Sequence, residues 1–264
     1  PGGPMGAAPL ENVPLGLLFA AVVGVAALAV EGGYRLGRYR LSHTTEEKEA
    51  PVGAMVGSIL GLFAFVLAFT FGLSANWFEA RRQAVLDESN AIGTTYLRAA
   101  LLPEPVRGES ARLLREYVDV RLAMVQDGRL AEGMTRSDEL QRKLWERAVA
   151  GARQQPGPIT GLYVASLNEV IDMHAVRVQV GVRNRIPPSI WAGLLALGAL
   201  ATTAVGYQAG IAATRRSPAM LALVLAFSGV LFMIADLDRP QQGFLTVGQQ
   251  PMLDLQAGMR ADVP

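Results

Sequence analysis

Four long apolar stretches divide the chain, at residues 13–30, 52–75, 188–212 and 218–235, and none has a charged residue in its interior. A helix needs about 20 mostly apolar residues to cross the hydrocarbon core of a bilayer. The pattern therefore predicts four transmembrane helices. No basic segment precedes the first stretch and no small-residue cleavage site follows it, so it predicts an uncleaved span rather than a signal peptide.

The residues between the second and third spans have a helical period of apolar positions. Helix punctuation predicts four helices, over residues 76–102, 105–126, 135–151 and 160–184. Thr135 with Asp138 three residues later resembles a capping box that opens the third helix. The apolar faces of the second and third helices are predicted to contain Leu114, Tyr117, Val118, Leu122, Val125, Leu140, Leu144 and Ala148.

The predicted fold is an all-α integral membrane protein, with four transmembrane helices and a four-helix extramembrane insert between the second and third spans. The predicted parts are a first transmembrane pair (1–75), the helical domain (76–186), a second transmembrane pair (187–237) and a C-terminal loop or tail (238–264). This tail is expected to pack on the insert, anchored by Phe244, Leu245, Met252 and Leu255.

Composition agrees with a membrane protein and narrows its chemistry. The 264 residues are 51% hydrophobic and 18% charged, with a mean hydropathy of +0.27. There is no cysteine and there are only two histidines, which excludes disulfides, thiolate metal sites and a histidine-rich metal centre. No nucleophile elbow, phosphate loop or zinc-ligand spacing occurs. We therefore expect no enzyme, no catalytic residue, no cofactor and no metal, and the net charge of +1 argues against nucleic acid as a partner.

Small side chains recur at steps of three and four along three of the spans, which allows close approach of helix backbones. We interpret these stripes first as packing between helices of one subunit, and alternatively as pore-lining surfaces. The stripes are Gly16, Ala20, Gly24 and Ala27; Gly53, Gly57, Gly61, Ala64, Ala68, Gly72 and Ala75; and Ala192, Ala196, Ala199, Thr203, Gly206 and Gly210.

Beside the small stripe of the second span lie four large apolar residues, Leu62, Phe65, Phe69 and Leu73. Aromatic side chains at helical spacing usually face the core or lipid. The alternative is a hydrophobic pore neck, in which several copies of the second span gate ions by dewetting.

Charged residues gather where the insert meets the spans. These candidate collar residues are Arg81, Arg82, Arg183, Arg185, Asp236, Asp238 and Arg239. One interpretation is an interfacial collar of ion pairs, and the other is a vestibule that attracts anions.

Polar residues on the first and last helices of the insert form a candidate polar network, made of Asn90, Asn168, Asp172 and His174. Such residues are usually a solvated surface or a satisfied network between helices. The functional alternative is a cation site or a histidine that senses pH.

The orientation stays open on the sequence. Arg35, Arg38, Arg40 and Lys48 in the first link, with Arg215 and Arg216 in the second, place both links in the cytoplasm and the insert outside by the positive-inside rule. The arginines that flank the insert favour the opposite orientation, with the insert in the cytoplasm.

Three stretches resemble the family of bacterial membrane proteins labelled bestrophin-like: RRQAVLDESNAIGTTYLRAALLPEP, LNEVIDMHAVRVQVGVRNRIPP and DLDRPQQGFLTVGQQPMLDLQ. The resemblance extends over nearly the whole chain. The family is in turn distantly similar to the bestrophins, which are anion channels. It implies a bacterial inner-membrane protein that forms a homo-oligomer, a pentamer by analogy, with the second span around a central pore that the insert extends. It also implies an insert in the cytoplasm, against the charge count.

Two hypotheses follow. One is an oligomeric, anion-permeable channel with Phe65 and Phe69 in its neck. The other is a non-conducting scaffold, sensor or accessory subunit whose insert binds another membrane protein. The second is favoured by the lack of charged residues inside the spans, because ion pathways often place an ionisable group there.

Overall fold

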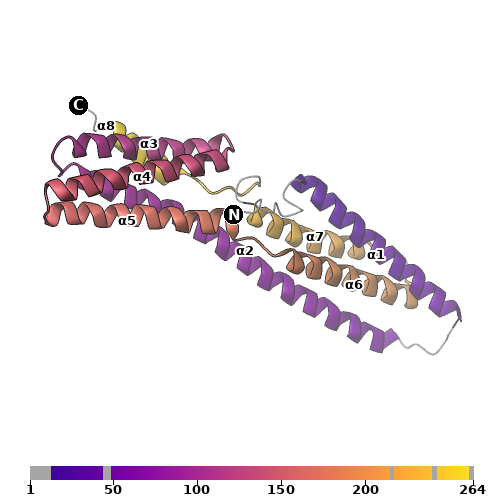
Figure 1. Cartoon of the computed structure of the whole chain (residues 1–264). Helices are drawn as coiled ribbons and strands as arrows, with labels where there is room; N and C mark the ends of the chain where they lie inside the picture. Colours follow the sequence, from indigo (N-terminus) through magenta and orange to yellow (C-terminus); the bar gives the residue numbers. More distant parts are fainter. Residues whose placement is uncertain (1–12, 44–48, 215–216, 240–242, 262–264) are drawn as a thin grey trace. The chain divides into compact units, whose positions relative to one another are not determined.

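The computed structural model describes residues 13–43, 49–214, 217–239 and 243–261, and within them it is all helical, with no strand. Lys48, Arg215 and Arg216, which were counted above for orientation, lie outside these residues. The helices are α1 (Leu15–His43), α2 (Glu49–Ala99), α3 (Val106–Gln126), α4 (Leu130–Gln154), α5 (Pro158–Val178), the π-helix η1 (Gln179–Arg183), α6 (Pro188–Ile211), α7 (Pro218–Asp238) and α8 (Gln250–Ala261) (Figure 1).

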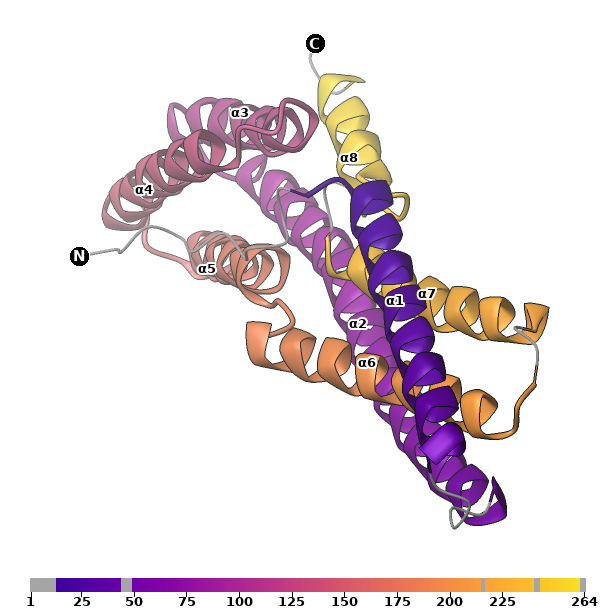
Figure 2. The same cartoon turned by 90° about the vertical axis from the view of Figure 1, so that its right-hand side faces the viewer.

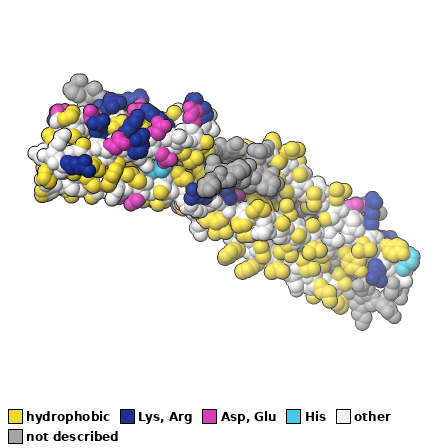
Figure 3. Space-filling view, in the orientation of Figure 1, with side chains coloured by type: hydrophobic (Ala, Val, Ile, Leu, Met, Phe, Trp, Pro, Cys, Tyr) yellow, Lys and Arg dark blue, Asp and Glu magenta, His cyan; other side chains and the backbone are white. Residues whose placement is uncertain are grey.

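The chain forms two compact units. Unit 1 contains Pro1–Asn76 and Arg185–Leu245, and unit 2 contains Trp77–Asn184 and Thr246–Pro264. All four predicted spans belong to unit 1, whose visible surface is mostly apolar, whereas charged side chains gather on the surface of unit 2 (Figure 3). Helix α2 is a single helix of 51 residues that contributes to both units.

Four helical segments are long and apolar enough to cross a membrane by length and composition: Leu15–His43, Pro51–Ala99, Pro158–Ile211 and Pro218–Asp238. Only about 20 residues are needed for a crossing, and the charge-free part of each segment coincides with a predicted span. Glu88 and His174, in unit 2, therefore lie outside the membrane-spanning stretches.

Helices α1 and α6 cross at glycines, and Figure 2 shows this crossing. A Cβ on Gly33 would lie 2.0 Å from the carbonyl oxygen of Thr203, and one on Gly206 would lie 2.0 Å from that of Val30. Only glycine permits backbones to approach this closely. Between helices in lipid the hydrophobic effect does not drive association, so this dispersion contact between the two backbones stabilises the pair. The predicted stripe of α6 is used at this crossing, since Gly206 and Gly210 both meet α1.

The stripe predicted for α1 is not the one that packs. Among the described residues no atom lies within 4 Å of a Cβ built on Gly16 or Gly24. Gly33 and Gly37 make the contact instead, because α1 continues to His43, well beyond the predicted end at residue 30.

Helix α2 packs in unit 1 through a face other than its small-residue stripe. The ring of Phe63 is 1% exposed and lies 4.9 Å from the ring of Phe227 in α7. Gly198 of α6 leaves room for that ring, since a Cβ there would be 3.0 Å from Phe63. The buried side chains on this face are Val56, Phe63, Leu67, Thr70 and Ser74.

Unit 2 has its own hydrophobic core, formed by the second half of α2 with α3, α4, α5 and α8. The predicted apolar faces of α3 and α4 lie in it, although Val125 is only partly buried. The core contains Ile92, Leu114, Tyr117, Val118, Leu122, Leu140, Leu144, Ala148, Tyr163, Leu167, Val170, Met252 and Met259, among others.

Two local predictions differ from the structure. Helix α4 begins at Leu130, so Thr135 lies inside it and its hydroxyl donates to the carbonyl of Ala131 instead of capping the helix.

The tail predicted as a loop contains helix α8, in which Met252 is fully buried. Of the four predicted anchors, Met252 and Leu255 pack on the core of unit 2, whereas Phe244 and Leu245 are 80% and 46% exposed and do not. Helix α8 packs closely because Gly93 of α2 leaves 3.3 Å between its Cβ position and Leu255.

Candidate functional site

The candidate neck residues lie on the uncovered face of α2. Leu62, Phe65 and Phe69 are 55%, 68% and 72% exposed, and Leu73 is half-buried. In the neighbouring small stripe, a Cβ on Gly57, Gly61 or Gly72 would meet no described atom of another helix within 4 Å, whereas one on Gly53 would lie 2.9 Å from Nε2 of Gln208 in α6. The interpretation of this stripe as packing inside one subunit therefore fits Gly53 but not these three glycines.

The exposed face continues along α2 at steps of seven residues. A seven-residue repeat is typical of helices that supercoil around one another. The exposed positions in this register are Leu62, Phe69, Asn76, Gln83, Asn90 and Leu97.

Among the collar residues of unit 2, Arg81 binds the backbone that follows α5. Arg81 is 3% exposed, and its Nε and Nη2 donate to the carbonyls of Val180 and Asn184 at 3.0 and 2.8 Å. These carbonyls belong to the π-helix and the residue that ends it, where regular helix bonding stops. Arg82 and Arg183 are exposed.

The collar residues of unit 1 bind backbone groups. Asp236, 4% exposed, accepts hydrogen bonds from the N–H of Phe244 at 2.7 Å and of Leu245 at 3.1 Å. Asp238 accepts from the N–H of Ile186 at 3.1 Å, and Arg239 donates to the carbonyl of Val13 at 2.6 Å. Arg185 is half-buried. These contacts hold the C-terminal end of α7 and the residues directly before α6 in place.

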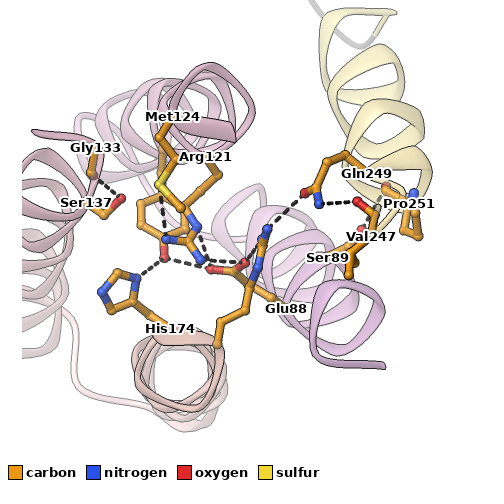
Figure 4. Close-up of polar contacts among 12 residues, drawn as sticks. Glu88, Ser89, Arg121, Met124, Gly133, Ser137, His174, Val247, Gln249 and Pro251 are labelled. Atoms are coloured by element: carbon orange, nitrogen blue, oxygen red, sulfur yellow. Dashed lines mark hydrogen bonds and ion pairs between the residues drawn. The ribbon is translucent and has the colours of Figure 1, made fainter. Parts of the chain in front are cut away.

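A buried ionic network lies at the centre of unit 2 (Figure 4). The carboxylate of Glu88, 0% exposed, faces two guanidinium groups. Arg121 of α3 approaches it with Nε 3.0 Å from Oε1 and Nη2 3.2 Å from Oε2. Arg177 of α5 contacts Oε2 through Nη1. Isolated burial of a carboxylate is very costly, so these pairs make its burial tolerable.

Burial and the neighbouring charges shift the pKa of Glu88 in opposite directions. Burial by itself raises the pKa of this carboxyl, but Arg121 and Arg177, with hydrogen bonds from Arg177 and Tyr117, together lower it below 4.5. Glu88 is therefore ionised at neutral pH. With two guanidinium groups to one carboxylate, the buried network carries an excess positive charge.

Tyr117 of α3 extends this network to a histidine. Its hydroxyl donates to Glu88 Oε1 at 3.0 Å, accepts from Gln141 Nε2 at 3.2 Å and lies 3.2 Å from Nδ1 of His174. Burial, followed by the Glu88 charge, raises the pKa of Tyr117 above its ordinary range, so the hydroxyl keeps its proton. On the other side of the ring, Nε2 of His174 lies 3.2 Å from the carboxylate of Asp138 in α4.

The network also reaches the C-terminal segment. Nη2 of Arg177 donates to the side-chain oxygen of Gln249 at 2.9 Å, and the hydroxyl of Ser89 donates to the carbonyl of Pro251 at 2.9 Å. Gln249 in turn donates to the carbonyl of Val247 at 3.1 Å. The start of helix α8 is thus tied to α5 through Gln249 and to α2 through Pro251 in its first turn.

Of the four residues in the predicted polar network, the structure brings only His174 into a buried cluster. Asn90, Asn168 and Asp172 are exposed. The residues that the prediction missed are Glu88, Tyr117, Arg121, Asp138, Gln141, Arg177 and Gln249. A signal was present for some of them, because Glu88 lies in register with Ile92 and Thr95, and Arg121 with Leu114 and Tyr117, on the apolar faces of their helices.

The described residues contain no group of three or more His, Cys, Asp and Glu side chains that could bind a metal ion.

A family model described as the Bestrophin-like domain matches residues 15–252, which covers all four spans and nearly all of unit 2. The chain belongs to the Bestrophin-like family. No curated protein and no solved structure matches it. With its apolar helices, this Bestrophin-like chain is a multi-pass, all-helical membrane protein.

Proposed function

We propose that this Bestrophin-like protein is a homo-oligomeric channel that passes anions. Copies of α2 surround an axial pathway, with Leu62, Phe65, Phe69 and Leu73 forming a hydrophobic neck. The observation that carries the proposal is the exposure of Phe65 and Phe69, 68% and 72%, on a face of α2 beside Gly57 and Gly61, which no other described helix covers.

The part of α2 in unit 2 supports assembly independently of lipid. Leu86 and Leu97 are 40% and 66% exposed there, beyond the charge-free stretch that ends before Glu79. Lipid tails cover apolar side chains inside the membrane, so outside it a second protein surface is the ordinary cover. Facing copies of α2, in register at steps of seven, supply that surface.

Anion selectivity is proposed from the exposed arginines. The buried collar residues bind backbone groups, which leaves Arg82 and Arg183 exposed near the ends of the spans in sequence. A ring of such guanidinium groups raises the local concentration of anions. The neck then gates by wetting and drying and needs no ionisable group in mid-membrane.

The test is chloride flux from liposomes that contain the purified protein, compared with the double variant Phe65→Ala and Phe69→Ala. We expect the variant to pass chloride several times faster, because a wider and less apolar neck stays wet. The matched control is Leu28→Ala in α1, 74% exposed, which removes a lipid-facing side chain and leaves the flux unchanged. If neither wild type nor the double variant passes chloride, the channel proposal fails.

A second candidate function, a scaffold that binds a partner protein through unit 2, is favoured by one surface. Leu97, Leu101, Ile159 and Leu162 are 66%, 62%, 50% and 51% exposed. Arg98 Nη1 donates to the carbonyl of Leu162 at 3.0 Å, which joins α2 to the first turns of α5. A monomer in nanodiscs that passes no chloride, but that a crosslinker at Leu162 joins reproducibly to one other membrane protein, would favour this function.

A further inference from the structure

His174 and its neighbours form a chain of contacts from the surface of unit 2 to its centre. Asp138 is 69% exposed at the side chain, His174 is 9% exposed and Glu88 is fully buried, with Tyr117 between the last two. The contacts link α4, α5, α3 and α2 in that order. No other histidine lies in unit 2, because His43 belongs to α1.

The number of protons decides which of these contacts are hydrogen bonds. Tyr117 has one hydroxyl proton, which it donates to Glu88, so it must accept from Nδ1–H of His174. In a neutral imidazole Nε2 is then unprotonated and faces the carboxylate of Asp138, acceptor against acceptor. Only a second proton on the ring turns the contact with Asp138 into a hydrogen bond.

That second proton adds charge where positive charge is already in excess. The charged groups that act on His174 are Glu88 of α2, Arg121 of α3, Asp138 of α4 and Arg177 of its own helix. The C-terminal segment contributes the uncharged Gln249, which contacts Arg177. Burial, then the charge of Arg121, lowers the pKa of His174 below 6.5 against the attraction of Glu88 and Asp138. Asp138 offsets this lowering of the pKa only weakly, because its carboxylate is exposed and water screens its charge.

Arg177 couples the protonation of His174 to helix α8, because its guanidinium repels the imidazolium and also binds Gln249. It lies three residues after His174 on the same face of α5, where like charges repel. Its guanidinium bridges Glu88 and Gln249, so displacement of Arg177 breaks the bond that precedes α8. Helix α8 has only 12 residues, and it is also held by Met252 and Met259 in the core and by hydrogen bonds from Gln256 and Arg260 to Asp119. Short elements at the edge of a domain open at a lower free energy than its centre, so loss of the Arg177 contact shifts α8 towards the open state.

We propose that His174 is a proton-operated latch for α8. Protonation of its Nε2 places an imidazolium against Arg121 and Arg177, draws Asp138 towards α5 and releases Gln249 with α8 from unit 2. Because α8 follows α7 along the chain after a short connection, its release changes the constraint on the end of a membrane-spanning helix.

Hydrogen exchange followed by mass spectrometry tests this latch on the full chain in nanodiscs. Exchange is measured between about pH 7.5 and 5.5, a range in which histidine is the side chain that ordinarily titrates, and is corrected for the intrinsic effect of pH. We expect amides of residues 250–261 to lose protection severalfold as the pH falls, while residues 113–122 in the core of α3 stay protected.

Variants separate the latch from a general effect of acid. His174→Gln keeps a polar side chain without a titrating proton and should abolish the acid response, whereas His43→Gln should retain it. Asp138→Asn, at an exposed position, should shift the response to lower pH. Gln249→Ala should expose α8 already at neutral pH, whereas Gln250→Ala, whose side chain binds Asp254, should not. An unchanged acid response in His174→Gln, or none in wild type, overturns the proposal.

Discussion

Gly206 of α6 lies against the backbone of Val30 in α1 so closely that a Cβ would be 2.0 Å from the Val30 carbonyl oxygen. The reverse contact, from Gly33 to Thr203, has the same separation. Because glycines on both helices allow this distance, α1 and α6 pack backbone against backbone in unit 1.

Gly206→Ala should destabilise unit 1 strongly, because the added methyl group meets backbone that cannot rotate away. Overpacking of this kind costs about 1–3 kcal/mol or more. Thermal unfolding of the purified protein in one detergent, with loss of the monodisperse peak, measures the effect. Gly24→Ala is the control, since its Cβ position is open, and equal losses for the two variants would contradict the crossing described here.

Glu88→Gln should destabilise unit 2 by about 3–5 kcal/mol, because it leaves Arg121 and Arg177 buried without a counter-charge. Chemical unfolding monitored by tryptophan fluorescence gives the value. Glu79→Gln removes a carboxylate that is exposed and 3.9 Å from Arg82, and should have no measurable effect. A Glu88→Gln protein as stable as wild type would show that the network contributes little.

Acid should destabilise unit 2 in two steps. Because the pKa of His174 is lowered on folding, its contribution is fully present above about pH 6.5 and is lost as the pH falls below that value. The pKa of Glu88 is also lowered, so its contribution is present above about pH 4.5 and is lost at more acid pH.

The melting temperature as a function of pH should therefore fall twice in wild type. In His174→Gln it should fall only in the second step. A first step that persists in this variant would assign the titration to another group.

Gly243→Ala should loosen the connection between α7 and α8. A Cβ there would be 2.2 Å from Oδ1 of Asp236, the carboxylate that binds the N–H groups of Phe244 and Leu245. Hydrogen bonds to a charged group contribute about 1.5–3 kcal/mol each where they are shielded from water, and less where they are partly exposed. Faster exchange of these two amides is the expected result, and Gly248→Ala, at an open position, should leave them unchanged.

The sequence predicts the helices well where composition and period agree. The four spans contain no charge, and the apolar positions of α3 and α4 recur at three and four, so Leu114, Tyr117 and Leu140 are correctly predicted as core. Helix α8 could not be distinguished from a loop because Pro251 and Gly258 interrupt its pattern.

The buried network is harder to predict because its charged members break the apolar pattern that reveals a core. Glu88 and Arg121 appear as polar exceptions on their helices, and only tertiary packing shows that they meet. Asp138 looked like a capping residue, whereas the early start of α4 places it opposite His174. The role of the α2 stripe could not be decided from the sequence, because small residues permit close packing equally within a chain and between chains.

Single-particle imaging of the protein in lipid nanodiscs tests the central claim most directly, because it gives both the number of subunits and the path along the axis. The account predicts a closed ring of identical chains, with α2 around the axis and the narrowest point at Phe65 or Phe69. A monomer, or an assembly in which these two rings face lipid and no axial pathway exists, would contradict it.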